Sequence, residues 1–289
     1  MSSELPVGRD ADRRPHGRRF LVLWLLLSVS ATVLAWILLG PLMPPGNGSV
    51  QASGQVFDNK VLLAVVTPVC VFVLLFVAYV LIAFGRNGSD ELLADGPADR
   101  GNRRIQIVWI VVTSAIMCGL GVFGSYELLK DGAGGGQGPS PTDVPANHAQ
   151  ALNVQVIAQQ WQFTYRYPSY GGIETSTLEL PAHTLVEFHV TSLDVVHSFW
   201  AYQLVVKADA NPGTDNIAYA QLKNPLSFQI RCVELCGLWH GYMYDTGQVV
   251  PQAQFIDWIA KEQKTLAPVE RYLPAYAPAY LPQPIDRGG

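Results

Sequence analysis

The chain has 289 residues and a formal net charge of −4; 49% of its residues are hydrophobic and only 15% are charged. Its mean hydropathy is positive, at +0.19, and the charged share is low for a soluble domain. The sequence has no basic patch of the kind that nucleic-acid binding requires, which excludes that function class. The length suits two modest units or one domain with a membrane anchor.

Three apolar runs follow a polar, arginine-rich tail of residues 1–19. They cover about residues 20–40, 61–85 and 105–126, within an anchor of residues 20–130. Each is at least as long as the roughly 20 residues that a hydrocarbon core of about 30 Å requires. None shows the polar face of a soluble helix. The sequence therefore predicts two to three transmembrane helices.

The basic residues predict the orientation of these spans. The tail carries five arginines, and the loop of residues 86–104 carries four, whereas Lys60 alone lies between the first and second runs. Basic loops stay on the cytoplasmic side, so everything after the third span is expected outside. The first run also resembles a signal peptide with a cleavage site at Val50-Gln51-Ala52, but its length favours an uncleaved anchor. Both readings leave the C-terminal domain outside.

The pattern changes after the third span. Residues 131–147 are rich in Gly and Pro and predict a flexible linker. Residues 148–262 contain short alternating runs, at 153–158, 162–167 and 185–191, that favour a β-sandwich or Greek-key barrel. A helix is expected at about 252–264, and residues 263–289 form a tail rich in Pro and Tyr. His189 lies on the polar phase of its run, so we expect it to be exposed.

Twelve residues near the end of this domain carry the chemistry. The run Cys232-Val-Glu-Leu-Cys236-Gly-Leu-Trp-His240-Gly-Tyr-Met243 holds two thiols, an imidazole and a thioether, which are ligands that copper prefers. A further histidine is needed from elsewhere, and His197 is the natural candidate. A structural zinc site and a disulfide between the two cysteines are the alternatives.

The spacing Cys-x-Glu-x-Cys-x3-His-x2-Met resembles subunit II of the haem–copper oxidases that oxidise cytochrome c. Three other segments resemble that family, namely residues 160–165, 194–199 and 207–213. The resemblance implies a membrane anchor of two to three helices followed by an all-β, cupredoxin-like Greek-key domain. It also implies a multi-pass protein of a bacterial plasma membrane, with this domain on the outer side.

The same resemblance implies a dinuclear copper centre of the CuA type. Cys232 and Cys236 would bridge both ions, and His197 and His240 would each bind one. Met243 would be a weak ligand to one ion and the backbone carbonyl of Glu234 a weak ligand to the other.

Two more roles follow from the family pattern. The carboxylate of Glu234 would help to hold Mg²⁺ or Mn²⁺ at the contact with subunit I. Trp161 would be the aromatic residue at which electrons enter.

The implied function is that of the subunit that accepts electrons from cytochrome c, soluble or membrane-bound. It would pass them to haem in subunit I, where oxygen is reduced to water, in a complex that also contains subunit III. A CuA subunit of a membrane nitric oxide reductase and a membrane-tethered copper carrier or assembly factor are the alternative functions. The ten Asp and Glu against five Lys and Arg of residues 148–262 suit a basic cytochrome c.

Two positions depart from the family pattern. Phe163 stands where a second tryptophan is usual, and Thr214 stands where a basic residue is frequent. The second departure leaves open a contact with haem propionates or with subunit I.

Overall fold

The computed structural model describes residues 10–84, 101–131, 135–136, 138, 140–141 and 143–270. The chain divides into two compact units. The first combines Met1–Met43 with Asp58–Leu120, and the second combines Pro44–Phe57 with Gly121–Gly289. The predicted combination of an apolar helical anchor with an all-β domain is confirmed.

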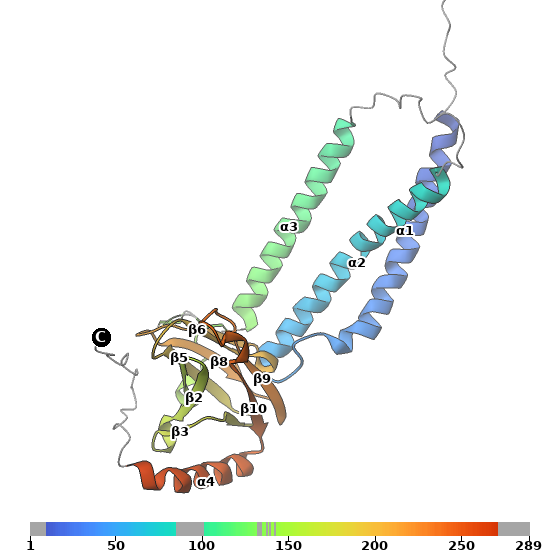
Figure 1. Ribbon diagram of the computed structural model, residues 1–289. Helices are drawn as coiled ribbons and strands as arrows, with labels where there is room; N and C mark the ends of the chain where they lie inside the picture. Colours follow the sequence, from blue (N-terminus) through green and yellow to red (C-terminus); the bar gives the residue numbers. More distant parts are fainter. Residues whose placement is uncertain are drawn as a thin grey trace, which may run out of the picture. The chain divides into compact units, whose positions relative to one another are not determined.

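Three long helices carry the apolar runs (Figure 1): α1 (Asp10–Leu39), α2 (Val50–Phe84) and α3 (Arg103–Asp131). Within the described residues, three stretches are long and apolar enough to cross a membrane. They are His16–Leu42, which covers most of α1 and the 3-10 turn Gly40–Leu42 after it, Val50–Ala83 in α2, and Arg103–Lys130 in α3. The helices begin or end beyond the predicted spans because polar residues that flank an apolar run can continue its helical turns. α2 shows this most clearly, since it begins at Val50, before Asn59 and Lys60.

The C-terminal domain consists of two five-stranded sheets. The first has the order β3 (Ile173–Thr175), β2 (Gln162–Tyr167), β1 (Leu152–Gln159), β5 (Leu185–Ser192) and β8 (Asn216–Gln221). The second has the order β4 (Glu179–Pro181), β10 (Tyr244–Val250), β9 (Leu226–Cys232), β6 (His197–Ala201) and β7 (Val206–Ala210). Most neighbouring strands are antiparallel, whereas β1 pairs with β5 and β4 pairs with β10 in parallel. The three predicted alternating runs are β1, β2 and β5.

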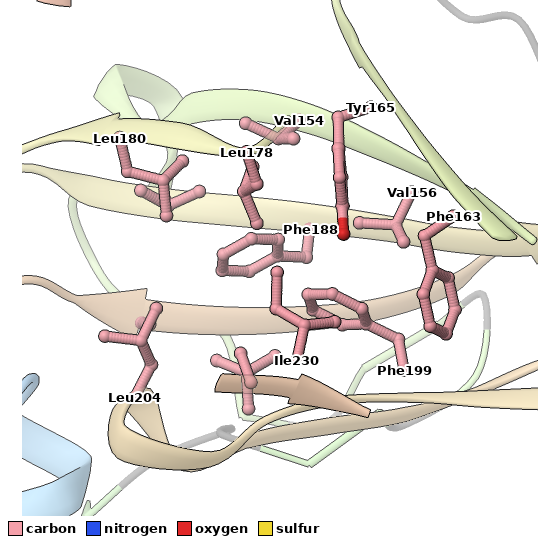
Figure 2. Packing of buried hydrophobic residues seen from close by; sticks show 14 of the residues in the cluster. Val154, Val156, Phe163, Tyr165, Leu178, Leu180, Phe188, Phe199, Leu204 and Ile230 are labelled. Atoms are coloured by element: carbon pink, nitrogen blue, oxygen red, sulfur yellow. The ribbon is translucent and has the colours of Figure 1, made fainter. Parts of the chain in front are cut away.

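The core lies between the sheets because alternate residues of each strand point inward. Val154, Val156 and Phe188 project from the first sheet, and Phe199 and Ile230 from the second, all without exposed surface. Figure 2 shows these side chains packed against one another. Phe163 joins them, 4% exposed, with its ring centroid 5.6 Å from that of Phe199 in an edge-to-face arrangement. Such a pair adds stability beyond the area that it buries.

Two segments outside the strands pack onto this domain. Gly48, between α1 and α2, donates its N–H to Gln203 O (3.2 Å) and accepts a hydrogen bond from the N–H of Lys223 (3.1 Å). Gly136, in the predicted flexible linker, donates its N–H to Lys207 O (2.8 Å). A Cβ at Gly136 would lie 2.7 Å from Ala208 Cβ, so only glycine fits this approach. At least this part of the linker is held against β7.

The helix α4 (Gln252–Glu270) follows the last strand (Figure 1). It ends later than predicted, so the expected tail from residue 263 begins inside the helix. Phe255 is fully buried, and Leu266 packs against the core cluster, which explains why the helix continues. The remaining part of the predicted tail, residues 271–289, lies outside the described residues.

Candidate metal centre

One edge of the second sheet brings the predicted ligand segments together. His197 is the first residue of β6, Cys232 is the last residue of β9, and Met243 immediately precedes β10. Since β9 is antiparallel to both β6 and β10, these three points meet at the same edge. The N–H of Cys232 donates to Met243 O (3.0 Å), which closes the base of the loop between them.

The ligand atoms of this loop converge around the two thiols. Cys232 Sγ lies 3.8 Å from Cys236 Sγ and 3.8 Å from His197 Nδ1. Cys236 Sγ lies 3.5 Å from His240 Nδ1 and 3.9 Å from Met243 Sδ. His197, Cys232, Cys236 and Met243 are all at most 7% exposed. Both cysteines are free thiols, so the alternative of a disulfide is not what the structure shows.

The backbone carbonyl of Glu234 faces the thiols, whereas the residue is exposed to solvent. This carbonyl oxygen lies 3.3 Å from Cys232 Sγ. A short 3-10 helix, His240–Tyr242, presents the His240 ring to Cys236, and the N–H of Met243 donates to His240 O (3.1 Å). The loop therefore positions an oxygen, a nitrogen and a thioether around two sulfur atoms.

Asp194 orients the buried His197 ring. Its Oδ1 lies 2.8 Å from His197 Nε2, which leaves Nδ1 directed at Cys232 Sγ. Burial raises the pKa of Asp194, but hydrogen bonds from the backbone of Gln160, from His197 and from the backbone of Val195 outweigh it and lower the pKa. Such a carboxylate partner fixes the tautomer and the direction of a metal-binding imidazole.

The two thiols do not lose their protons equally. Burial raises the pKa of Cys232, but hydrogen bonds with His197 and with the backbone of Ser198 and Glu234 outweigh burial and lower the pKa overall. Burial and the neighbouring Cys232 thiolate together raise the pKa of Cys236. Without a metal, the pair therefore prefers one thiolate and one thiol. A cation that binds both sulfurs would displace the second proton.

Gln160 connects both ligand segments. Its backbone N–H donates to Asp194 Oδ2 (2.7 Å), and its side-chain Nε2 donates to Cys236 O (2.8 Å). The next residue, Trp161, is half-buried, and its indole lies against Gly237. A Cβ at Gly237 would lie 3.0 Å from Gln160 Nε2 and 3.4 Å from Trp161 Cζ2. Gly237 also has φ of +115°, so this close packing depends on glycine.

The structure brings together every side chain that was predicted to bind copper and places Trp161 beside the loop. No role was expected for Asp194 or Gln160, although both lie in segments that resemble the family. The only signal in the sequence was proximity, because Asp194 precedes His197 by three residues and Gln160 directly precedes Trp161. Thr214 lies in a turn, with its N–H donating to Asn211 O (3.2 Å).

The expectation that His189 is exposed is wrong. Its side chain is 24% exposed, with Nδ1 2.7 Å from Asp215 Oδ2 and Nε2 3.4 Å from Glu187 Oε1. The alternating pattern gave the correct sheet face, but it could not show that Asp215, which precedes β8, covers the ring. Both ring nitrogens face carboxylates, so His189 belongs to an ion-pair cluster separate from the thiols.

Comparisons with known proteins match this domain and the anchor. A family model described as cytochrome c oxidase subunit II, periplasmic domain, matches residues 175–250. A probable cytochrome c oxidase subunit 2 of Rickettsia prowazekii is 27% identical over 234 residues, which are 72% of this chain and 67% of that protein. Cytochrome c oxidase subunit 2 of Synechocystis is 25% identical over 275 residues, 83% of this chain and 82% of that protein.

Among solved structures, the chain is similar to the periplasmic domain of subunit II of cytochrome oxidase of Bradyrhizobium japonicum. The sequence identity is 27%, the TM-score is 0.38, and the match covers 39% of this chain and 94% of that one.

Proposed function

We infer that this chain, which belongs to the cytochrome c oxidase subunit II family, is the subunit through which electrons enter a respiratory oxidase. The observation that carries this inference is the convergence of two thiols, two imidazole nitrogens, a thioether and a backbone carbonyl at one sheet edge. The reduction of oxygen to water belongs to another subunit of that complex.

The donor set fits a pair of copper ions better than one zinc ion. Structural zinc takes four ligands in a closed tetrahedron. Here Met243 Sδ and Glu234 O lie near the thiols in addition to two cysteines and two histidines, and a thioether is a ligand typical of copper. We propose that Cys232 and Cys236 bridge two ions, that His197 and His240 each bind one, and that Met243 and Glu234 O are weak ligands.

When bound, a copper pair bridged by two thiolates supplies one-electron redox chemistry without making or breaking bonds to substrate. The protein's part is to keep the ligands still. Asp194 fixes the His197 ring, and Gln160 ties that segment to the Cys236 carbonyl. The Trp161 indole, half-buried against Gly237, offers an aromatic group between solvent and the loop, which supports it as the residue at which electrons enter.

The proposed partners follow from the proposed role of this chain as the electron-accepting subunit of an oxidase complex. Glu234 is exposed, so its carboxylate is free to help hold Mg²⁺ or Mn²⁺ at a contact with subunit I. The apolar helices anchor the chain in a membrane, and the β domain lies on the outer side. We propose a bacterial plasma membrane, three spans, cytochrome c as the donor, and assembly with subunits I and III.

The test is copper loading of the full-length chain in detergent, followed by optical and electron paramagnetic resonance spectra. We expect a purple protein in which one unpaired electron is delocalised over two ions. The variant Cys232→Ser should lose this signal. The matched control Cys118→Ser removes an exposed thiol of α3 and should retain it.

A blue, mononuclear copper signal would contradict the proposal, as would binding of zinc in preference to copper. Retention of the two-ion signal in Cys232→Ser would contradict the proposed bridging role. Reduction by cytochrome c, measured on the assembled oxidase, then separates an electron-accepting subunit from a copper carrier.

A further inference from the structure

A groove lies between α1 and α2, within the helical unit. Its volume is about 890 Å³. Its apolar lining comes from Val22 and Leu23 of α1 and from Leu75, Ala78 and Ile82 of α2. Arg18 and Arg19 line the same groove, and both are exposed. An apolar groove that carries two guanidinium groups matches the two parts of an anionic lipid.

The two helices are antiparallel where the groove lies, and aromatic contacts hold them together. His16 Nδ1 lies 3.0 Å from Tyr79 OH, so the beginning of α1 lies beside the end of α2. Further along, the Phe20 ring packs edge-to-face on Phe72 at 5.4 Å, and Trp24 Nε1 donates to Pro68 O (2.9 Å). Ala78 and Ala83 line the groove with small side chains. The groove is thus built by a fixed helix pair.

The position of the groove along the helices indicates its occupant. The α2 residues that line it span Leu75 to Ala83, which is about 12 Å at ~1.5 Å per residue. Half of a hydrocarbon core is about 15 Å thick, so this groove covers most of one leaflet but not the whole membrane. A transmembrane helix of a partner would need a groove along the full span. One acyl chain beneath its headgroup needs only this length.

We propose that this groove binds one anionic phospholipid, with its phosphate at Arg18 and Arg19 and an acyl chain along Val22, Ala78 and Ile82. Basic residues between membrane helices at the bilayer surface recognise such headgroups. By the predicted orientation of the anchor, this lipid belongs to the cytoplasmic leaflet. The proposal is independent of the copper centre, because it involves no residue of the β domain.

The experiment uses the full-length chain in its oxidase complex, reconstituted into nanodiscs of phosphatidylcholine. A small amount of phosphatidylglycerol with a photoactivatable acyl chain is included. We expect cross-links at residues 16–23 and 75–83. The double variant Arg18→Gln/Arg19→Gln should reduce labelling on the order of tenfold. The control Arg103→Gln/Arg104→Gln removes two charges that do not line the groove, at the start of α3, and should leave labelling unchanged.

A second pair of variants tests the acyl chain. Ala78→Phe fills the groove and should reduce labelling, whereas Val77→Phe adds the same ring at a neighbouring residue, 51% exposed, that does not line the groove. Equal labelling by phosphatidylcholine, or labelling unaffected by the loss of Arg18 and Arg19, would overturn the proposal. Cross-links from residues 16–23 to another polypeptide would also overturn it. If the double variant fails to assemble, competition by unlabelled phosphatidylglycerol against phosphatidylcholine on the wild-type complex decides the same question.

Discussion

At the scale of single residues, Gln160 contacts both of the segments that hold the proposed copper ligands. Its amide donates to the Cys236 carbonyl, and its backbone N–H donates to the carboxylate that orients His197. Both ligand segments therefore share one point of attachment. A change there should alter the geometry of the centre without removing a ligand.

We predict that Gln160→Glu loosens the ligand loop. The substitution keeps the size of the side chain but replaces the donor to Cys236 O with a negatively charged acceptor beside Asp194. Loss of one hydrogen bond is worth about 1 kcal/mol, or about a fivefold change in equilibrium. Copper should be lost to a chelator several times faster, and the hyperfine pattern in the electron paramagnetic resonance spectrum should change.

Gln162→Glu is the matched control for this change, because Gln162 is exposed at the start of β2. It should behave as the wild type. Equal copper loss from both variants would show that added negative charge, rather than the bond to Cys236, causes the effect.

A second residue-scale prediction concerns pH. Burial lowers the pKa of His189, but the hydrogen bond and charge of Asp215 and the charge of Glu187 outweigh it and raise the pKa. The neighbouring strand β1 contributes the neutral Gln155 opposite the ring. A raised histidine pKa contributes stability that is fully present below the unfolded pKa of about 6.5 and is lost as pH rises through the folded pKa.

We therefore expect Asp215→Asn to lower the free energy of unfolding on the order of 1 kcal/mol at pH 5.5, and by less at pH 9. Denaturant unfolding of the β domain within the full chain, followed by near-ultraviolet circular dichroism, measures this. Asp209→Asn, at an exposed carboxylate of β7, is the control. A stability loss in Asp215→Asn that does not depend on pH would contradict the ion-pair account.

The proposed ligands within residues 232–243 could be singled out from the sequence because their residue types and spacing are typical of a copper site, whereas His197 had to come from outside that run. The roles of Asp194 and Gln160 could not be predicted, because they depend on backbone positions that bring residues 160, 194 and 236 together across the domain. Asp and Gln occur in many ordinary loops and turns, so neither residue type nor spacing indicates the contacts of Asp194 and Gln160 with the ligand segments. His189 shows the same limit, since its partner Asp215 is distant in the sequence.

At the scale of elements, the alternating runs predicted β1, β2 and β5 because each has one face in the core. The docking of Gly48 and Gly136 was not predictable. Glycine in a loop usually indicates freedom of the backbone, and only the packed structure shows that both glycines are needed for close approach. The segment Pro44–Phe57 therefore belongs to the β unit, although it lies between two apolar helices in the sequence.

We predict that Gly48→Ala detaches this segment from the β domain. A Cβ there would lie 2.6 Å from Gln203 O, so the two hydrogen bonds of Gly48 must move or break. Overpacking of this kind costs typically 1–3 kcal/mol. Hydrogen exchange at residues 48–53 should accelerate. Gly121→Ala is the control, because an added Cβ at this helical glycine would meet no atom beyond its own helix backbone within 4 Å, and it should leave exchange unchanged. Unchanged exchange in Gly48→Ala would mean that the backbone absorbs the contact.

At the scale of the whole molecule, the charge of the outer domain bears on how a donor reaches it. Residues 148–262 carry an excess of acidic over basic side chains, and the ligand loop exposes apolar residues, with Leu235 78% and Leu238 84% exposed. Acidic charge attracts a basic protein at long range, whereas apolar contacts act only when the two surfaces meet. The acidic charge therefore governs the first encounter with a donor, and the apolar residues govern the final contact.

We therefore predict that the rate of reduction of the assembled oxidase by a basic cytochrome c falls on the order of tenfold as salt rises, because the Debye length shrinks to about 10 Å at 0.1 M and about 3 Å at 1 M. Stopped-flow measurements under second-order conditions report this rate. A small uncharged reductant serves as the control and should show no such dependence. If the rate with basic cytochrome c is flat or rises with salt, the acidic excess plays no part in docking, and the apolar residues of the ligand loop alone select the donor.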